Sequence, residues 1–258
     1  MKASTIIKSM MVAALAALTL PVAASANLTA RANHDHITVD LFYHGSEVSV
    51  RGVSDPGAEL IVKLESPETG IVMKKKDKVG GIIWMNTGKV HFEDIPDLYF
   101  VQSSKPLDEI LSAEEQNSYI VGYGAVKDHA TVSPAKDQAE KDMLFGQFLK
   151  FKESNKVYLA KSGGFDMETK DDVQSYYMNF DWPYQAKPGD YTVTVYAVKD
   201  GKVVETATAK VDVEQVGAVK ALAGMARNNG AVYGVLSVLA ALMAGFGVGM
   251  VFKGGGAH

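Results

Sequence analysis

A stretch near the C-terminus, residues 230–252, constrains this chain most, because its 23 residues carry no formal charge. Arg227 precedes it and Lys253 follows it. A helix of this length would extend about 34 Å at about 1.5 Å per residue, which is enough to cross a hydrocarbon core of about 30 Å. Tyr233 falls one turn inside the first end, where an aromatic ring with a hydroxyl suits the membrane interface. The sequence therefore predicts a transmembrane helix at 230–252 and a short tail at 253–258.

The N-terminus has the composition of a secretory signal peptide. Two lysines precede an apolar run at 10–22, and small residues end the segment at Ala26. This order predicts a signal peptide at 1–26. The alternative is an uncleaved anchor, but about 13 apolar residues are too few to span a bilayer comfortably. Export would make this a single-pass protein of the bacterial cytoplasmic (inner) membrane, with a periplasmic main domain and a cytoplasmic C-terminus.

Glycines recur at a spacing of four within the predicted span. Gly230 and Gly234 form one pair, and Gly245 and Gly249 form another. Small residues at this spacing let two helix backbones approach closely, so self-association or a membrane-protein partner is predicted at this surface. The alternative is that glycine is simply common in membrane helices.

Composition excludes several classes of function. The chain has no cysteine, which rules out disulfides, thiol nucleophiles and cysteine-ligated metals. Removing the signal takes two of the 26 basic residues and none of the 30 acidic ones, so the formal charge moves from −4 to −6. An acidic chain lacks the basic footprint of a nucleic-acid-binding protein. Lys74-Lys75-Lys76 is the main basic cluster, and it is interpreted as the solvated edge of a strand.

The predicted exported domain, residues 27–215, is mainly β. Short apolar or alternating runs between residues 37 and 101 are separated by turn sequences rich in Gly, Pro, Asp and Ser. Asn86-Thr87-Gly88 predicts a hairpin between strands at 81–85 and 89–92, and Trp84 is expected to be a structural residue of the first. Near the C-terminal end, Asp200-Gly201 predicts a second hairpin. Short strands at this spacing are typical of a β-sandwich or a β-barrel.

A helical insertion is predicted near residues 106–153. Pro106 suits the first position of a helix, and Ser112 with Glu115 three residues later forms a capping box. Ser133-Pro134 is expected to open a longer helix. Its predicted core-facing residues are Ala139, Met143, Phe148 and Phe151.

One strand indicates the type of sandwich. Residues 188–195, Pro-Gly-Asp-Tyr-Thr-Val-Thr-Val, resemble the penultimate strand of immunoglobulin-like domains. In such domains a tyrosine near the strand start bonds back to the backbone as a tyrosine corner, and Tyr191 is assigned to that position. The predicted fold class is an immunoglobulin-like β-sandwich with a helical insertion, plus one C-terminal transmembrane helix. This is a prediction about fold and says nothing about chemistry.

Two segments resemble a known family. They are Gly-Ile-Ile-Trp-Met-Asn at 81–86 and Ile-Pro-Asp-Leu-Tyr-Phe-Val-Gln-Ser-Ser-Lys-Pro-Leu at 95–107. The chain resembles the uncharacterised transmembrane proteins first catalogued in alphaproteobacteria (Alph_Pro_TM type) over nearly the whole mature length. The order of features matches too: export signal, β-rich domain and one C-terminal span. The resemblance implies this topology and carries no established activity.

A histidine cluster is the best candidate for a metal site. His34 and His36 would share one face of a strand, and His44 follows eight residues later. Imidazoles with the intervening carboxylate suit zinc or copper. The alternative is a polar entry segment with no bound metal, because no third ligand is fixed.

Sequence motifs of enzymes are absent: there is no P-loop, nucleophile elbow, dinucleotide loop or His-Glu-x-x-His. Ser103-Ser104 can be paired with His91 or His129 as a nucleophile and base, but Ser104 is interpreted as a helix start. Gly122-Tyr123-Gly124 is interpreted as a turn. No catalytic residue and no cofactor is predicted.

Aromatic residues cluster between 176 and 184. Alternate members are expected to fill the core, leaving the others for a recognition surface. The cluster consists of Tyr176, Tyr177, Phe180, Trp182 and Tyr184.

The sequence as a whole predicts a membrane-anchored periplasmic binding or accessory module that serves a membrane partner such as a transporter. The alternative is a periplasmic metal-binding protein using the histidine cluster. A hydrolase is the third hypothesis.

Overall fold

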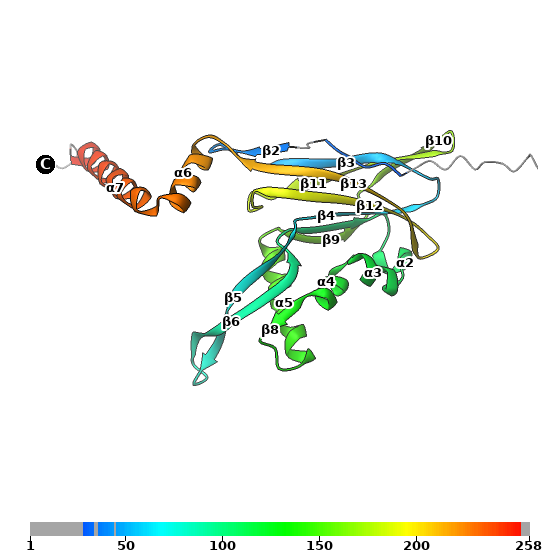
Figure 1. The fold of residues 1–258 in the computed structure, drawn as a ribbon, viewed down its shortest axis with the longest axis horizontal. Helices are drawn as coiled ribbons and strands as arrows, with labels where there is room; N and C mark the ends of the chain where they lie inside the picture. The colour runs from blue at the N-terminus through cyan, green and yellow to red at the C-terminus, as the bar shows by residue number, and fades with distance from the viewer. Residues whose placement is uncertain (1–27, 34–35, 44, 254–258) are drawn as a thin grey trace, which may run out of the picture.

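The computed structural model describes residues 28–33, 36–43 and 45–253, so the predicted signal peptide at 1–26 lies outside it. Strands hold 46% and helices 32% of the described residues, which confirms the mainly β prediction. The described strands form an outer sheet, a central sheet and a ribbon sheet (Figure 1). The outer sheet has the order β1 (Arg31–Ala32), β3 (Ser46–Ser54), β11 (Val173–Trp182), β10 (Asp166–Lys170). The central sheet has the order β2 (His36–Val39), β13 (Lys202–Gln215), β12 (Gly189–Lys199), β4 (Glu59–Glu65), β7 (Tyr99–Ser103), β9 (Tyr158–Ser162). The ribbon sheet has the order β5 (Glu68–Val79), β6 (Ile83–Pro96), β8 (Thr131–Ser133).

The outer and central sheets pack face to face around one hydrophobic core. Side chains of β11 alternate between exposed and buried, as the two-residue period of a strand requires. Its inward residues meet Val50 of β3 and Val62 and Val195 of the central sheet in one continuous cluster. These inward residues are Tyr176, Met178, Phe180 and Trp182.

The other face of the central sheet is also buried, beneath the helical insertion. Ile61 and Tyr99 point to this side and pack with Phe148, which stacks on Phe92 of the ribbon sheet at 4.6 Å between ring centroids. Burial on both faces explains why the five central residues of β4 are all buried, so that the strand shows no alternation of apolar and polar residues over Leu60, Ile61 and Val62. The insertion comprises α2 (Leu107–Ile110), α3 (Ala113–Tyr119), α4 (Tyr123–His129) and α5 (Gln138–Ser154).

The start of the longest inserted helix differs from the prediction. Ser133-Pro134 does not open it, because Ser133 ends β8 and α5 is capped by Asp137, whose side chain accepts from the Glu140 N–H at 2.8 Å. Of the four residues expected in the core, Phe148 is buried, whereas Ala139 is exposed and Met143 and Phe151 are about half exposed. Leu144, Phe145 and Lys152 are the other buried residues of α5.

The hairpin expected at residues 86–88 is also wrong. β6 runs through this segment without a break, and the chain turns instead at Gly80 and Gly81, whose φ angles are +62° and +76°. Such angles suit glycine, which has no Cβ to clash. Lys75 is paired with Gly88 and Lys76 with Asn86, so Thr87 is the extra residue of a bulge. The resulting ribbon extends away from the two packed sheets (Figure 1).

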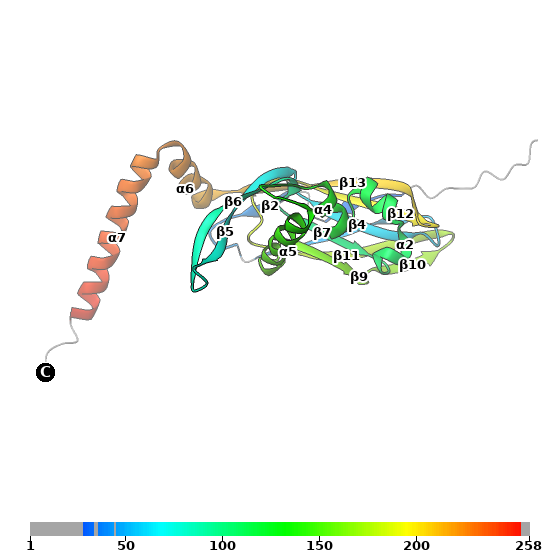
Figure 2. The same ribbon diagram turned by 90° about the horizontal axis from the view of Figure 1, so that it is seen from below.

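The chain leaves the central sheet at Gln215 and continues into two helices, α6 (Gly217–Asn228) and α7 (Gly230–Lys253). Within α7, Gly230–Met250 is long and apolar enough to cross a membrane, and no part of its apolar window is buried against the protein. Figure 2 shows α7 standing clear of the sheets. A helix with this composition and no protein cover agrees with the predicted transmembrane segment.

Candidate functional site

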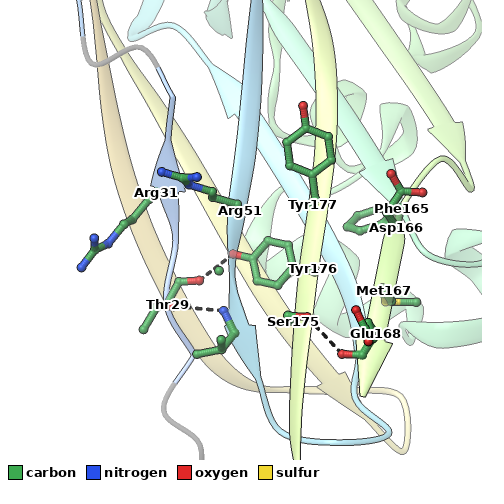
Figure 3. A pocket seen from close by; sticks show the side chains of 12 residues that line it. Thr29, Arg31, Arg51, Phe165, Asp166, Met167, Glu168, Ser175, Tyr176 and Tyr177 are labelled. Atoms are coloured by element: carbon green, nitrogen blue, oxygen red, sulfur yellow. Dashed lines mark hydrogen bonds between the residues drawn. The ribbon is translucent and has the colours of Figure 1, made fainter. Parts of the chain in front are cut away.

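Four side chains form one row across the outer sheet. Cα pairing places Arg31 of β1 opposite Arg51 of β3, Arg51 opposite Tyr177 of β11, and Tyr177 opposite Asp166 of β10. Directly opposed residues project from the same face of a sheet. All four are exposed, which identifies this as the face turned away from the core. Figure 3 shows the row, with the Arg51 side chain extending toward β1.

A shallow hollow follows this row. It has a volume of about 800 Å³ and is lined by the four residues of the row together with a second row of Val53, Ser175 and Glu168. The Ser175 hydroxyl donates to the Glu168 carbonyl at 3.1 Å, which links β11 to β10 at this edge (Figure 3). The floor of the hollow is therefore hydrogen-bonded sheet.

Contacts of Thr29 hold the strand that carries Arg31. The Thr29 N–H donates to the Val53 carbonyl at 2.9 Å, and the Val53 N–H donates to the Thr29 hydroxyl at 3.0 Å. From the core, the Tyr176 hydroxyl donates to the Thr29 carbonyl at 2.6 Å. Burial raises the pKa of the Tyr176 phenol, so it keeps its proton and remains a donor. These bonds fix β1 at the edge of β3 and bring Arg31 beside Arg51.

The charges in the hollow are divided between its two sides. Within the described residues, no carboxylate lies at ion-pair distance from the guanidinium of Arg31 or Arg51. Asp166 and Glu168 lie on β10 at the opposite side, with Tyr177 between. A guanidinium offers a fork of donors that fits two oxygens of a carboxylate, sulfate or phosphate. The arginine side of the hollow is thus suited to bind an anionic group.

The expected alternation of the aromatic cluster between core and surface is confirmed, and a recognition role for its exposed members stays a prediction. Tyr176, Phe180 and Trp182 are buried, whereas Tyr177 is 40% and Tyr184 is 71% exposed. Of these two exposed tyrosines, Tyr177 lies in the hollow. Arg31 and Arg51 were not identified from the sequence, because no local motif marks them and only the pairing of β1 with β3 brings them together.

The predicted metal ligands lie largely outside the described structure, since His34 and His44 are not described. His36 lies in β2, where its Nδ1 atom is 2.8 Å from Asp212 Oδ2 and its Nε2 atom is 3.9 Å from Glu214 Oε2. The described residues contain no group of three possible metal ligands. The metal site stays a prediction.

The serine pair is placed by strand contacts. The Ser104 hydroxyl donates to Glu59 Oε2 at 2.6 Å and accepts from the Leu60 N–H at 3.1 Å, so it joins β7 to β4. The expectation that Ser104 starts a helix is wrong, because α2 is capped by Pro106 without a side-chain hydrogen bond. Among the described contacts, none joins Ser103 or Ser104 to a histidine.

A third local interpretation also differs from the structure. Gly122 is the N-cap residue of α4, so Gly122-Tyr123-Gly124 begins a helix and is not the expected turn. At Gly122 an added Cβ would lie 2.9 Å from Leu107 Cδ2, so glycine allows the close approach of α2 to α4.

The remaining residues predicted from the sequence are Tyr191, Trp84 and the glycines of the transmembrane helix. The Tyr191 hydroxyl donates to the Lys187 carbonyl at 2.6 Å, and its ring meets Trp182 edge-on at 4.7 Å between centroids. The side chain of Trp84 lies outside the described part of the structure. On α7 an added Cβ would meet nothing within 4 Å at any glycine of the two predicted pairs, Gly230, Gly234, Gly245 and Gly249.

Within the described residues, a mainly β domain is joined to one exposed apolar helix that is long enough to cross a membrane. The chain belongs to the Alph_Pro_TM family, whose model is described as "Putative transmembrane protein (Alph_Pro_TM)" and matches residues 27–254. No curated protein matches the chain. The family assignment agrees with the resemblance found in the sequence and places the protein at a membrane.

Proposed function

We propose that this protein is a membrane-anchored periplasmic binding or accessory module that presents the outer sheet to a membrane partner, and that Arg31 and Arg51 bind an anionic group of that partner. One observation carries the proposal: the two arginines are direct cross-strand neighbours on an exposed face, and no described carboxylate pairs with either of them. Two like charges directly opposite each other destabilise a sheet. A bound anion between them removes that repulsion.

The chemistry of the hollow favours binding over catalysis. The polar side chains that line it carry two guanidiniums, two phenols, two hydroxyls and two carboxylates. Of these residues, Tyr176 is buried beneath the open surface. Exclusion of water strengthens the electrostatic interactions that stabilise a transition state, and an open sheet face does not provide it. A flat face with an aromatic residue and arginines suits recognition of another protein, because tyrosine and arginine supply much of the energy at interfaces.

The orientation rests on the two ends of the chain. The family match begins at residue 27, directly after the predicted cleavage position. Export of the domain across the bacterial inner membrane would leave the span of α7 as the anchor and residues 253–258 on the cytoplasmic side. A partner such as a transporter in the same membrane would then meet the domain at close range.

We also propose that the two packed sheets are immunoglobulin-like. In that fold one sheet has the order A-B-E-D and the other contains G-F-C. The outer sheet β1-β3-β11-β10 follows the first order, and β13-β12-β4 follows the second, with each strand in the right place along the chain. Tyr191 lies near the start of β12, the equivalent of strand F, and bonds to a carbonyl four residues upstream. The helical insertion then falls between the equivalents of strands C and D.

The test is isolation of the full chain from native membranes in mild detergent, followed by mass spectrometry of what co-purifies. We expect a membrane protein to co-purify with the natural chain. Replacement of Arg31→Glu and Arg51→Glu should reduce its recovery about tenfold, because charge-assisted contacts are lost and repulsion is gained. The matched control is Lys202→Glu with Lys210→Glu, two exposed lysines of β13 outside the hollow. Equal recovery from both double variants would show that the arginines do not bind the partner.

A further inference from the structure

The turn of the β5–β6 ribbon exposes apolar side chains far from either core. Ile82 is 85% exposed, Ile83 is 61% exposed and Met85 is 51% exposed. Single exposed apolar residues are ordinary on a protein surface. Three within four positions at the end of a projecting ribbon form an apolar tip, and such a patch marks a contact with a partner or a membrane.

Lysines occupy the ribbon directly behind this apolar tip. Lys74, Lys76 and Lys78 alternate along β5, so they share one face, and Lys89 of β6 lies directly opposite Lys74 on that face. All four side chains are exposed. A like-charged pair directly opposite in a sheet is destabilising, so the arrangement calls for an anionic surface against it.

The lysine face is turned away from the protein body. Residues at the alternate positions of β5, Ile71 and Met73, pack against the second core, and Lys75 pairs with Glu140 of α5 at 3.2 Å. The lysines thus remain on the open side. Lysines along an edge also discourage pairing with other strands, but that role does not explain exposed isoleucines at the tip, which would promote association.

The ribbon and the membrane anchor lie at the same end of the molecule. Figures 1 and 2 both place the turn between β5 and β6 toward the end of the long axis from which α6 and α7 leave. In Figure 2 the ribbon and α7 also extend to the same side of the packed sheets. The tip and the anchor therefore project from the same end of the molecule.

We propose that the apolar tip inserts into the headgroup region of the bilayer that holds α7, with the lysine face on anionic phospholipid headgroups. The order along the ribbon matches the order of a membrane surface. Ile82, Ile83 and Met85 would reach the acyl boundary, and the lysines behind them would lie at the level of the phosphates. The contact gives the domain a second attachment, which limits its rotation about the segment that joins it to α7. The proposal does not depend on the Arg31–Arg51 site.

The test uses the absence of cysteine from the natural chain, which makes an introduced one unique. The full-length Ile82→Cys variant, labelled with an environment-sensitive nitrobenzoxadiazole dye, is reconstituted into vesicles of phosphatidylcholine with or without phosphatidylglycerol. With the anionic lipid, we expect a blue shift and quenching by nitroxide lipids. The control label is at Val204→Cys, an exposed position on β13, and should stay in water. Either orientation in the vesicle presents the domain with a bilayer surface.

Variants that remove lysine charges test whether the dye signal at position 82 arises from contact with anionic lipid. Each lysine near an anionic surface contributes about a fivefold factor in binding. Lys74→Gln with Lys89→Gln in the labelled chain should thus lower the equilibrium constant for association of the tip with the bilayer about 25-fold. High salt should also weaken this association, because it screens the charges. Lys202→Gln with Lys210→Gln should leave the signal unchanged. The circular dichroism spectrum of every variant serves as the check on folding.

Two results would overturn the proposal. One is a folded, labelled chain whose Ile82 dye stays in water in both vesicle types. The other is shielding of the dye by a partner protein in lipid-free detergent, with no response to phosphatidylglycerol, which would make the tip a protein contact. Loss of the partner from the Arg31 and Arg51 variants would leave the dye signal unchanged, so this proposal and the proposed function fail separately.

Discussion

The carbonyl oxygen of Thr29 lies over Gly52 so closely that a Cβ atom on residue 52 would be 1.8 Å from it. The same Cβ would lie 2.8 Å from the Tyr176 hydroxyl, which donates to that carbonyl. Glycine at this position of β3 is thus required for the edge contact that places Arg31 beside Arg51. The shape of the candidate site thus depends on Gly52, which has no side chain, as well as on the two arginines.

Gly52→Ala should therefore displace the segment 28–33 from β3. Because backbone atoms cannot move aside cheaply, we expect a loss of about 2 kcal/mol in the free energy of unfolding. Hydrogen exchange should be faster at the Asn33 N–H, which donates to the Ser49 carbonyl of β3 at 2.9 Å. Gly70→Ala is the matched control, since an added Cβ there meets nothing within 4 Å. Unchanged exchange in Gly52→Ala would show that the edge adjusts, and that the arginine pair does not need Gly52.

Asp97 and Lys152 form an ion pair that is largely shielded from water. Lys152 Nζ lies 3.3 Å from Asp97 Oδ1 and donates to the Asp97 carbonyl at 2.8 Å, while Lys187 Nζ lies 2.5 Å from Asp97 Oδ2. Burial raises the pKa of Asp97, but the two ammonium groups outweigh it and hold that pKa below its ordinary value. Burial also lowers the pKa of Lys152, against the pull of Asp97.

The lowered pKa of Asp97 predicts loss of stability in acid. A carboxyl whose pKa is depressed in the folded state stabilises the fold above its unfolded pKa, about 3.9. That contribution disappears as pH falls through the folded value. Asp97→Asn should cost about 2 kcal/mol at neutral pH, because it leaves Lys152 shielded without a counter-charge, and should flatten the decline below about pH 4. Thermal unfolding of the detergent-solubilised chain across this pH range measures both effects.

A double variant gives this prediction its control. Lys152→Met removes the stranded ammonium, so Asp97→Asn with Lys152→Met should recover much of the lost stability, as apolar replacements of buried pairs do. If the double variant were no more stable than Asp97→Asn alone, the cost would lie in the carboxylate's contact with Lys187.

Glu115 links the helical insertion to the central sheet. Its Oε2 atom accepts from the Val203 N–H of β13 at 2.9 Å, and its own N–H donates to the Ser112 side chain at 3.3 Å. Glu115→Ala removes the acceptor for Val203 and should lower the unfolding free energy by about 1 kcal/mol. Glu114→Ala, an exposed neighbour on the same turn, should change it by less than about 0.5 kcal/mol. Equal effects from both would point to a general loss of charge at the start of α3.

The contacts of Glu115 also show what the sequence can and cannot predict. The prediction that Ser112 caps a helix is confirmed, because a cap is a local relationship between residues three apart. The carboxylate was expected to bond back to the helix start, yet the structure directs it to β13, which is distant along the chain. Local sequence determines the backbone at a helix end, whereas tertiary packing decides where a longer side chain finds its partner.

The turn of the ribbon and the arginine pair could not be predicted from local sequence either, because both depend on strand pairing. Asn86-Thr87-Gly88 has a strong turn composition, but strand pairing on both sides absorbs it as a bulge, and Gly80-Gly81 turns the chain instead. Arg31 and Arg51 become neighbours only through the register of β1 on β3. The transmembrane helix and the alternation of β11 were predictable because each depends on one continuous segment and its period.

The glycines of α7 give the last prediction. At 100° per residue, Gly230, Gly234, Gly245 and Gly249 lie within an arc of about 100° on one face of the helix, whereas Gly247 lies well outside it. A face of small residues allows close approach of a second helix. Gly245→Ile should therefore reduce helix pairing about tenfold, measured by energy transfer between labelled chains in lipid bilayers. Gly247→Ile adds the same side chain two residues away and should leave pairing intact; a similar loss in both variants would mean that the glycine face is not the contact.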